Sequence, residues 1–104
     1  MSRAPKARGR SWERQVAEMV DGIRLGRPHE PDVVTQHLVI ECKNEQGLAV
    51  SARAITQARE STIRGPGLGR QWAVFKRRKG EHSFTVTMDG KFAVQLLRDA
   101  GYIE

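Results

Sequence analysis

Cysteine, long apolar runs and acidic residues are all scarce in this sequence of 104 residues. Its one cysteine, Cys42, cannot form an internal disulfide and has no Cys or His partner at zinc-binding spacing, so we expect a small strand residue. No apolar segment reaches the length of a membrane span, and no basic amphipathic helix that would bind a membrane surface stands out. No apolar stretch of the kind found in secretion signals follows Met1. We therefore expect a cytoplasmic protein that does not bind membranes.

The excess of basic over acidic residues is the main feature of the composition. Lys and Arg number 18 against 12 acids, a formal net charge of +6. This balance favours a polyanionic partner, and nucleic acid is the leading candidate. The length allows one core and no second recognition module, so we expect a single domain over residues 11–104. Residues 1–10 are expected to form a flexible basic arm that either grips phosphates or stays solvated, with the bases Arg3, Lys6, Arg8 and Arg10.

The segment at residues 38–43 is a run of β-formers that ends with Glu41 and Lys43. Because side chains alternate across a strand, these two project from the same face. If this run pairs with residues 32–35 in a hairpin that turns at Gln36-His37, Asp32 lies opposite Glu41, with Cβ atoms about 5 Å apart. Two carboxylates so placed repel each other, and a divalent cation with oxygen ligands would relieve the repulsion. The alternative is a pair of acids on a solvated sheet edge, since Gln-His is not a favoured hairpin turn.

The rest of the pattern predicts helices and further strands. Helices are expected from Ser11 to about residue 20, from Ser51 to near Gly65, and after Asp89. Strands are expected at residues 23–25, 71–76 and 83–88, in addition to the hairpin. The order α-β-β-β-α-β-β-α predicts an α/β or α+β domain with a central mixed sheet flanked by helices. The helix residues expected to face the core are Trp12, Val16, Met19 and Val20, then Ala54, Ile55, Ala58 and Thr62, and finally Phe92, Ala93, Leu96, Leu97 and Ala100.

Two helix residues are placed where they could reach the paired carboxylates. Glu13 lies beside the apolar stripe of the first helix, although an acid in a first turn also suits the helix dipole. Gln57 lies at the edge of the second helix's stripe and turns either toward the site or toward water. Further bases either form a phosphate-binding rim near the carboxylates or lie on solvated loops; they are Arg64, Arg70, Lys76, Arg77, Arg78 and Lys79. The glycine-rich residues 65–69 lack the ending of a phosphate-binding loop and are expected to be a flexible connection.

These motifs resemble the PD-(D/E)XK nuclease superfamily, and within it the small Holliday junction resolvases of the archaeal type and their phage relatives. The resemblance rests on the segment Arg10-Ser11-Trp12-Glu13-Arg14, on Pro31-Asp32, on Glu41-Cys42-Lys43 at a strand end and on Gln57-Ala58-Arg59 in a helix. It covers nearly the whole chain in element order, but its specific motifs are only a handful of residues. It implies a restriction-endonuclease-like fold and a metal-dependent, structure-selective endodeoxyribonuclease, acting above all on Holliday junctions in DNA recombination and repair.

The resemblance also implies roles for individual residues. Asp32, Glu41 and the backbone carbonyl of Cys42 would bind Mg²⁺, for which Mn²⁺ would substitute. Glu13 would support the metal directly or through water. Lys43 would serve the attacking water, and Gln57 occupies a helix position that such enzymes use near the site.

Two other functions are compatible with these residues. One is another nuclease of the same superfamily, acting on a flap, repair or restriction substrate. The other is a basic DNA-binding module without catalysis, although the presence of Asp32, Glu41 and Lys43 together favours an enzyme. Because resolving a four-way junction takes two symmetric incisions and one chain carries one candidate site, we expect a homodimer. Candidate surfaces are the outer residues of the last helix and the strand Phe84 to Met88.

Overall fold

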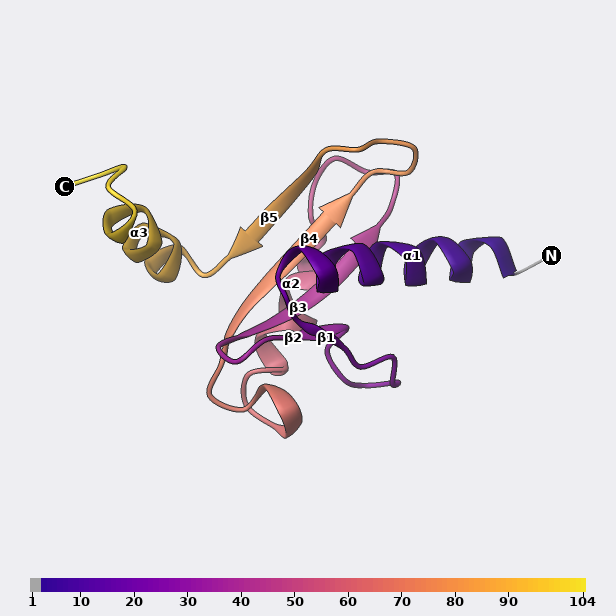
Figure 1. The fold of residues 1–104 in the computed structure, drawn as a ribbon, viewed down its shortest axis with the longest axis horizontal. Coiled ribbons are helices and arrows are strands. Elements are labelled where there is room, and N and C mark those ends of the chain that lie inside the picture. The colour runs from indigo at the N-terminus through magenta and orange to yellow at the C-terminus, as the bar shows by residue number, and fades with distance from the viewer. Residues whose placement is uncertain (1–2) are drawn as a thin grey trace.

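The computed structural model describes residues 3–104, and the side chains of residues 10–104. Its centre is a five-stranded mixed sheet in the order β1-β2-β3-β4-β5, accompanied by three helices and one 3-10 turn (Figure 1). The element order and the mixed sheet expected from the sequence are confirmed. None of the described helices combines the length and the apolar composition that a membrane crossing requires.

Helix α1 (Arg3–Met19) covers one face of the sheet and begins earlier than expected. The prediction of a Ser11 N-cap is wrong, because residues 3–10 continue the same helix in place of an irregular arm. Most of these residues are good helix formers, and a proline at position 5 is tolerated in a first turn. Trp12 and Val16 are buried as expected, whereas Met19 is half exposed. The indole of Trp12 donates a hydrogen bond to the Phe75 carbonyl at 3.0 Å, which fixes α1 on the sheet.

Strands β1 (Ile23–Arg24), β2 (Val33–Val34) and β3 (Leu38–Asn44) form an antiparallel meander. Val33 pairs with Ile40 and Val34 with Val39, which is the register expected from the sequence. The unfavourable Gln-His turn is stabilised by Thr35, whose hydroxyl accepts hydrogen bonds from the backbone N–H groups of His37 and Leu38. This register brings Asp32, just before β2, opposite Glu41.

Strands β3 and β4 (Gln71–Arg77) are parallel, joined by the crossover helix α2 (Ala52–Glu60). The Ser51 hydroxyl caps α2 by accepting from the Ala54 N–H at 3.1 Å, as expected. Ala54 and Ala58 are buried against Val74, on the opposite side of the sheet from the core beneath α1. The result is a layered arrangement in which β3 is covered on both sides, so charged residues on β3 lie in a largely buried setting.

The glycine-rich connection after α2 is an ordered turn, and the expectation of a flexible connection is wrong. Residues Gly65–Gly67 form a 3-10 turn, η1, and Gly67 is buried. A Cβ at Gly67 would lie 1.9 Å from the Ser61 carbonyl oxygen and 2.7 Å from a Val39 methyl. Only glycine allows this close approach, which holds η1 against the central strand.

Strand β5 (Phe84–Met88) pairs antiparallel with β4 and forms one edge of the sheet. Helix α3 (Gly90–Asp99) follows it, with its N-terminus capped by the Asp89 carboxylate as expected. The expectation that its apolar residues face the core is wrong, because no residue of α3 is buried. Figure 1 shows α3 beyond the end of β5, away from the rest of the molecule.

Candidate active site

The paired carboxylates expected at Asp32 and Glu41 come together at the middle of β3. The backbone N–H of Cys42 donates to Asp32 Oδ2 at 2.8 Å, which fixes the Asp32 carboxylate against the edge of β3. Glu41 extends from β3 and is only 8% exposed. Both residues line a pocket of about 760 Å³ between the sheet, α1 and α2. The alternative of a solvated sheet edge therefore does not apply to this pair.

The electrostatics of the pair are those of two like charges placed close together, one buried and one half-buried. Burial, with the nearby Asp32 charge as the second cause, raises the pKa of Glu41 to about 8. Burial also raises the pKa of Asp32, against the opposing effects of the Cys42 N–H and of Lys43. A hydrogen bond between the two carboxyl groups favours the proton on Glu41. Both shifts show that the site disfavours two carboxylate charges side by side, and a bound cation would relieve this repulsion.

Lys43 and Gln57 meet in the same pocket. Lys43 Nζ donates to Gln57 Oε1 at 3.2 Å, so the side chain of Gln57 turns toward the site and not toward water. Lys43 projects from the same face of β3 as Glu41, which the alternation of side chains predicted. Gln57 thus links α2 to β3 and holds the ammonium group beside the carboxylates.

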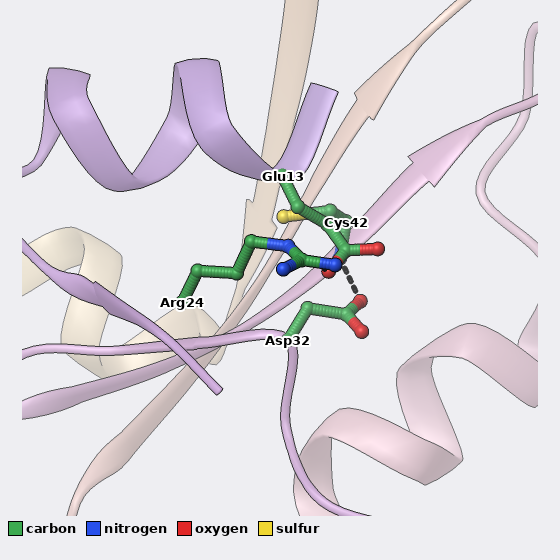
Figure 2. A network of polar contacts seen from close by, with 4 residues as sticks. All are labelled: Glu13, Arg24, Asp32 and Cys42. Carbon is green, nitrogen blue, oxygen red and sulfur yellow. Dashed lines mark hydrogen bonds and ion pairs between the residues drawn. The ribbon is translucent and has the colours of Figure 1, made fainter. Parts of the chain in front are cut away.

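Glu13 reaches the site from α1, but its carboxylate is engaged by an arginine that sequence reasoning missed. Arg24 Nε, on β1, donates to Glu13 Oε1 at 3.1 Å. In Figure 2, Glu13 from α1, Arg24 from β1 and Asp32 from the loop before β2 lie in one group, and Asp32 contacts Cys42. Burial, followed by the nearby Asp32, raises the pKa of Glu13, and Arg24 opposes this rise. Arg24 therefore supplies a positive charge that acts on both Glu13 and Asp32.

Cys42 contributes backbone and not thiol chemistry. Its side chain is half-buried on the α1 side of the sheet, where burial raises the pKa of the thiol and keeps it protonated. Its N–H points toward Asp32. In a β-sheet the backbone N–H and C=O of one residue point toward the same neighbouring strand. The Cys42 carbonyl therefore lies on the same side of β3 as Asp32.

The donor set suits a hard cation. Within residues 10–104, no three Asp, Glu, His or Cys side chains gather closely enough to form a metal cluster by themselves. Mg²⁺ is commonly held by only one or two carboxylates, with water and substrate phosphate completing its shell. Asp32 and Glu41, with the Cys42 carbonyl, satisfy that pattern, and the raised pKa values of the two carboxyl groups are those expected where a positive charge would be stabilising.

The pocket also brings in residues that the sequence did not single out. Arg27, His29 and Glu30 line it from the turn before Asp32, and Ser61 lines it from the end of α2. Glu30 Oε2 is buried and has no hydrogen-bond partner among residues 10–104. Sequence spacing gave no signal for these residues, because the turn reaches the pocket only once the meander has formed.

The expected phosphate-binding rim is only partly present. Arg64 lines the pocket and is exposed, and Arg10 is exposed near Glu13. The expectation for Lys76 is wrong, since its Nζ is buried and donates to the Ala49 carbonyl.

Other bases predicted to bind phosphate make contacts within the chain. Arg70 donates to the carbonyls of Thr35 and Pro66. Arg77 stacks over the Trp12 ring, 4.6 Å from its centroid, and Arg78 pairs with Glu81 at 3.1 Å. Lys79 is exposed in the β4–β5 turn but does not line the pocket. The side chains of Arg3, Lys6 and Arg8 lie outside the described residues.

Comparisons of the chain with protein-family models, with curated proteins and with solved structures found no match.

Proposed function

We propose that this chain is a metal-dependent, structure-selective endodeoxyribonuclease that hydrolyses phosphodiester bonds in branched DNA, with four-way (Holliday) junctions as its main substrate. One observation carries the proposal: the pair of the half-buried Asp32 and the buried Glu41, with Lys43 beside it, in one pocket. Burying two carboxylates together costs stability, and such groups with perturbed pKa values are concentrated at functional sites.

Asp32, Glu41 and the Cys42 carbonyl would hold Mg²⁺, with Mn²⁺ as a substitute. When bound, the cation would stabilise the charge that develops on the phosphate and lower the pKa of an attacking water. Glu13, held by Arg24, lines the same pocket as Asp32 and Glu41. We therefore assign it an indirect role in supporting the metal.

Lys43 is assigned to the attacking water and the phosphate. Its contact with Gln57 uses one N–H donor and leaves two for water or a phosphate oxygen. Gln57 acts through Lys43, as a positioning residue that keeps the ammonium group at the carboxylates.

DNA as the partner is supported by charge and by the pocket's lining. The chain has a formal net charge of +6. Arg27 and Arg64 line the pocket, where a phosphate backbone would pass. A cytoplasmic location belongs to the same proposal.

A basic DNA-binding module without catalysis is the competing function. Such a module gains nothing from a carboxylate pair inside its anion-binding pocket, where the two charges would repel phosphates. A nuclease acting on flap, repair or restriction substrates would use the same site chemistry.

Cleavage of a panel of end-labelled substrates separates these possibilities. We expect the purified chain to cut a four-way junction faster than a flap and much faster than a plain duplex, in Mg²⁺ and not in EDTA. Preference for the flap or the duplex would reassign the substrate. Tight binding of all three without any cleavage would favour the non-catalytic module.

A further inference from the structure

The loop between β1 and β2, residues 25–32, carries His29 to the candidate active site. His29 is exposed to solvent and lines the same pocket as Asp32, Glu41 and Lys43. Among the described residues that line this pocket, it is the only histidine. We propose that His29 is the general acid of the reaction and donates a proton to the leaving sugar oxygen, an inference that rests on the proposed function.

The loop holds His29 in a conformation that few side chains adopt. Its φ of +65° lies in the left-handed region, which is uncommon for residues other than glycine, and such backbone strain is concentrated at functional sites. The Leu25 N–H donates to the Asp32 carbonyl at 3.0 Å, and the Glu30 N–H donates to the Arg27 carbonyl at 3.4 Å. A proline on either side of the His29-Glu30 pair limits the loop further. The conformation of His29 is therefore imposed by the loop around it.

The proposed reaction includes one proton transfer that has not been assigned. In phosphodiester hydrolysis, the oxygen of a water molecule forms a bond to phosphorus, and the bond from phosphorus to a sugar oxygen breaks. The attacking water loses a proton to solvent, whereas the leaving oxygen must gain a proton to become a hydroxyl group. A positioned acid that supplies this proton accelerates the step. Lys43 is assigned to the attacking water and the phosphate, which leaves the role of this acid open.

The acidic side chains of the pocket are already engaged. Asp32 and Glu41 are assigned to the cation, which binds ionised carboxylates. Three further acids each form an ion pair with an arginine, at 3.1 to 4.0 Å; they are Glu13, Glu30 and Glu60. The proton donor is therefore sought among the other side chains.

Of these side chains, histidine suits proton transfer best. Arginine does not release its proton in proteins, which excludes the two arginines of the pocket. The Ser61 hydroxyl already donates to the Gln57 carbonyl at 3.0 Å. Histidine is the side chain that ordinarily changes charge between pH 5 and 8, so it both holds and releases a proton under the conditions of the reaction. His29 thus combines a place in the pocket with the chemistry that the leaving oxygen requires.

Cleavage of two junction substrates tests the proposal. One is an ordinary four-way junction, and in the other sulfur replaces the leaving sugar oxygen at the position that the wild type cuts. A thiolate is a much weaker base than an alkoxide, so it leaves without a proton. His29→Asn keeps a side chain that tolerates a positive φ but has no acidic proton. We expect it to cut the ordinary junction at least about 100-fold more slowly than the wild type, and the sulfur junction within about threefold of the wild-type rate.

Three further variants serve as comparisons. His82→Asn changes an exposed histidine outside the pocket and should match the wild type on both substrates. Lys43→Ala should be slow on both, because its role is in the attack and not in the departure of the leaving group. His29→Gly, which also tolerates the backbone conformation, should repeat the pattern of His29→Asn. Both His29 variants should keep the Tm and the junction affinity of the wild type, measured without Mg²⁺.

Two results would overturn the proposal while the proposed function stands. One is cleavage of the ordinary junction at the wild-type rate by both His29 variants. The other is equal slowing on the two substrates, or unfolding of both variants, since His29 would then bind DNA or support the fold and would not donate the proton. A wild type that cuts neither substrate would overturn the proposed function itself, and this inference with it.

Discussion

Glu41 joins the fold to the proposed chemistry, since its burial is unfavourable without a cation. Because its pKa is raised from 4.5 to about 8 in the folded chain, its contribution to stability is complete below pH 4.5 and is lost as the pH rises through 8. We expect the metal-free protein to melt several degrees lower at pH 9 than at pH 5, as about 1 kcal/mol shifts the Tm of such domains by about 4–8 °C.

The Tm of the chain in EDTA, measured from pH 5 to pH 9, checks this expectation. Glu41→Gln should flatten the decline, and Mg²⁺ should raise the wild-type Tm most at high pH, where cation and proton compete least. Parallel curves for the wild type and Glu41→Gln would show that Glu41 titrates normally.

Lys43 should affect cleavage far more than binding. Lys43→Ala removes the group assigned to the attacking water and the phosphate, so we expect cleavage to fall by at least about 100-fold. DNA affinity in Ca²⁺ should change by less than about threefold, because one charge among many phosphate contacts is lost. Lys91→Ala, on the exposed polar side of α3, serves as the control. If cleavage and affinity fell together, Lys43 would belong to the DNA grip.

At the scale of single elements, η1 depends on one glycine. Gly67→Ala would place a methyl 1.9 Å from the Ser61 carbonyl oxygen, so the turn would have to move away from β3. We expect a loss of about 2 kcal/mol or more in the free energy of unfolding, measured by urea titration. Gly90→Ala, where an added Cβ meets nothing, should be neutral or slightly stabilising. Equal stability of both variants would contradict the close packing of η1.

Local patterns in the sequence predicted most elements because they act over a few residues. Alternation across β3 and the turn before it placed Asp32 opposite Glu41, and the capping residues Ser51 and Asp89 marked their helices. The start of α1 was missed because Ser11 is a good N-cap that the continuing helix does not use.

Contacts that depend on tertiary structure could not be predicted in this way. The Arg24–Glu13 ion pair joins β1 to α1, and no sequence spacing identifies it. In the sequence, nothing distinguishes the buried Lys76 from a lysine that is exposed to solvent. For α3, amphipathicity correctly indicated an apolar face, but it does not tell whether that face packs within the chain or against another.

At the scale of the whole molecule, the bases divide into those available to DNA and those used by the fold. Log K for DNA binding falls with the logarithm of the salt concentration, and Arg64→Gln should make this slope less steep by about 0.9, the value for one lost phosphate contact. Lys76→Met should leave the slope unchanged, because its ammonium is already bonded to the Ala49 carbonyl. Binding of junction DNA measured across a salt series distinguishes them. Equal slopes for the wild type and Arg64→Gln would remove Arg64 from the DNA surface.

The central claim is that the Asp32–Glu41 pair makes the molecule a metal-dependent nuclease, and cleavage of a four-way junction in Mg²⁺ by three purified chains tests it most directly. The wild type and Glu45→Gln, which changes an exposed acid four residues away, should cut the junction at similar rates. Glu41→Gln should bind the junction but cut it at least about 100-fold more slowly, and EDTA should abolish all cleavage. Wild-type cleavage rates in Glu41→Gln, or no cleavage by the wild type in either Mg²⁺ or Mn²⁺, would contradict the claim.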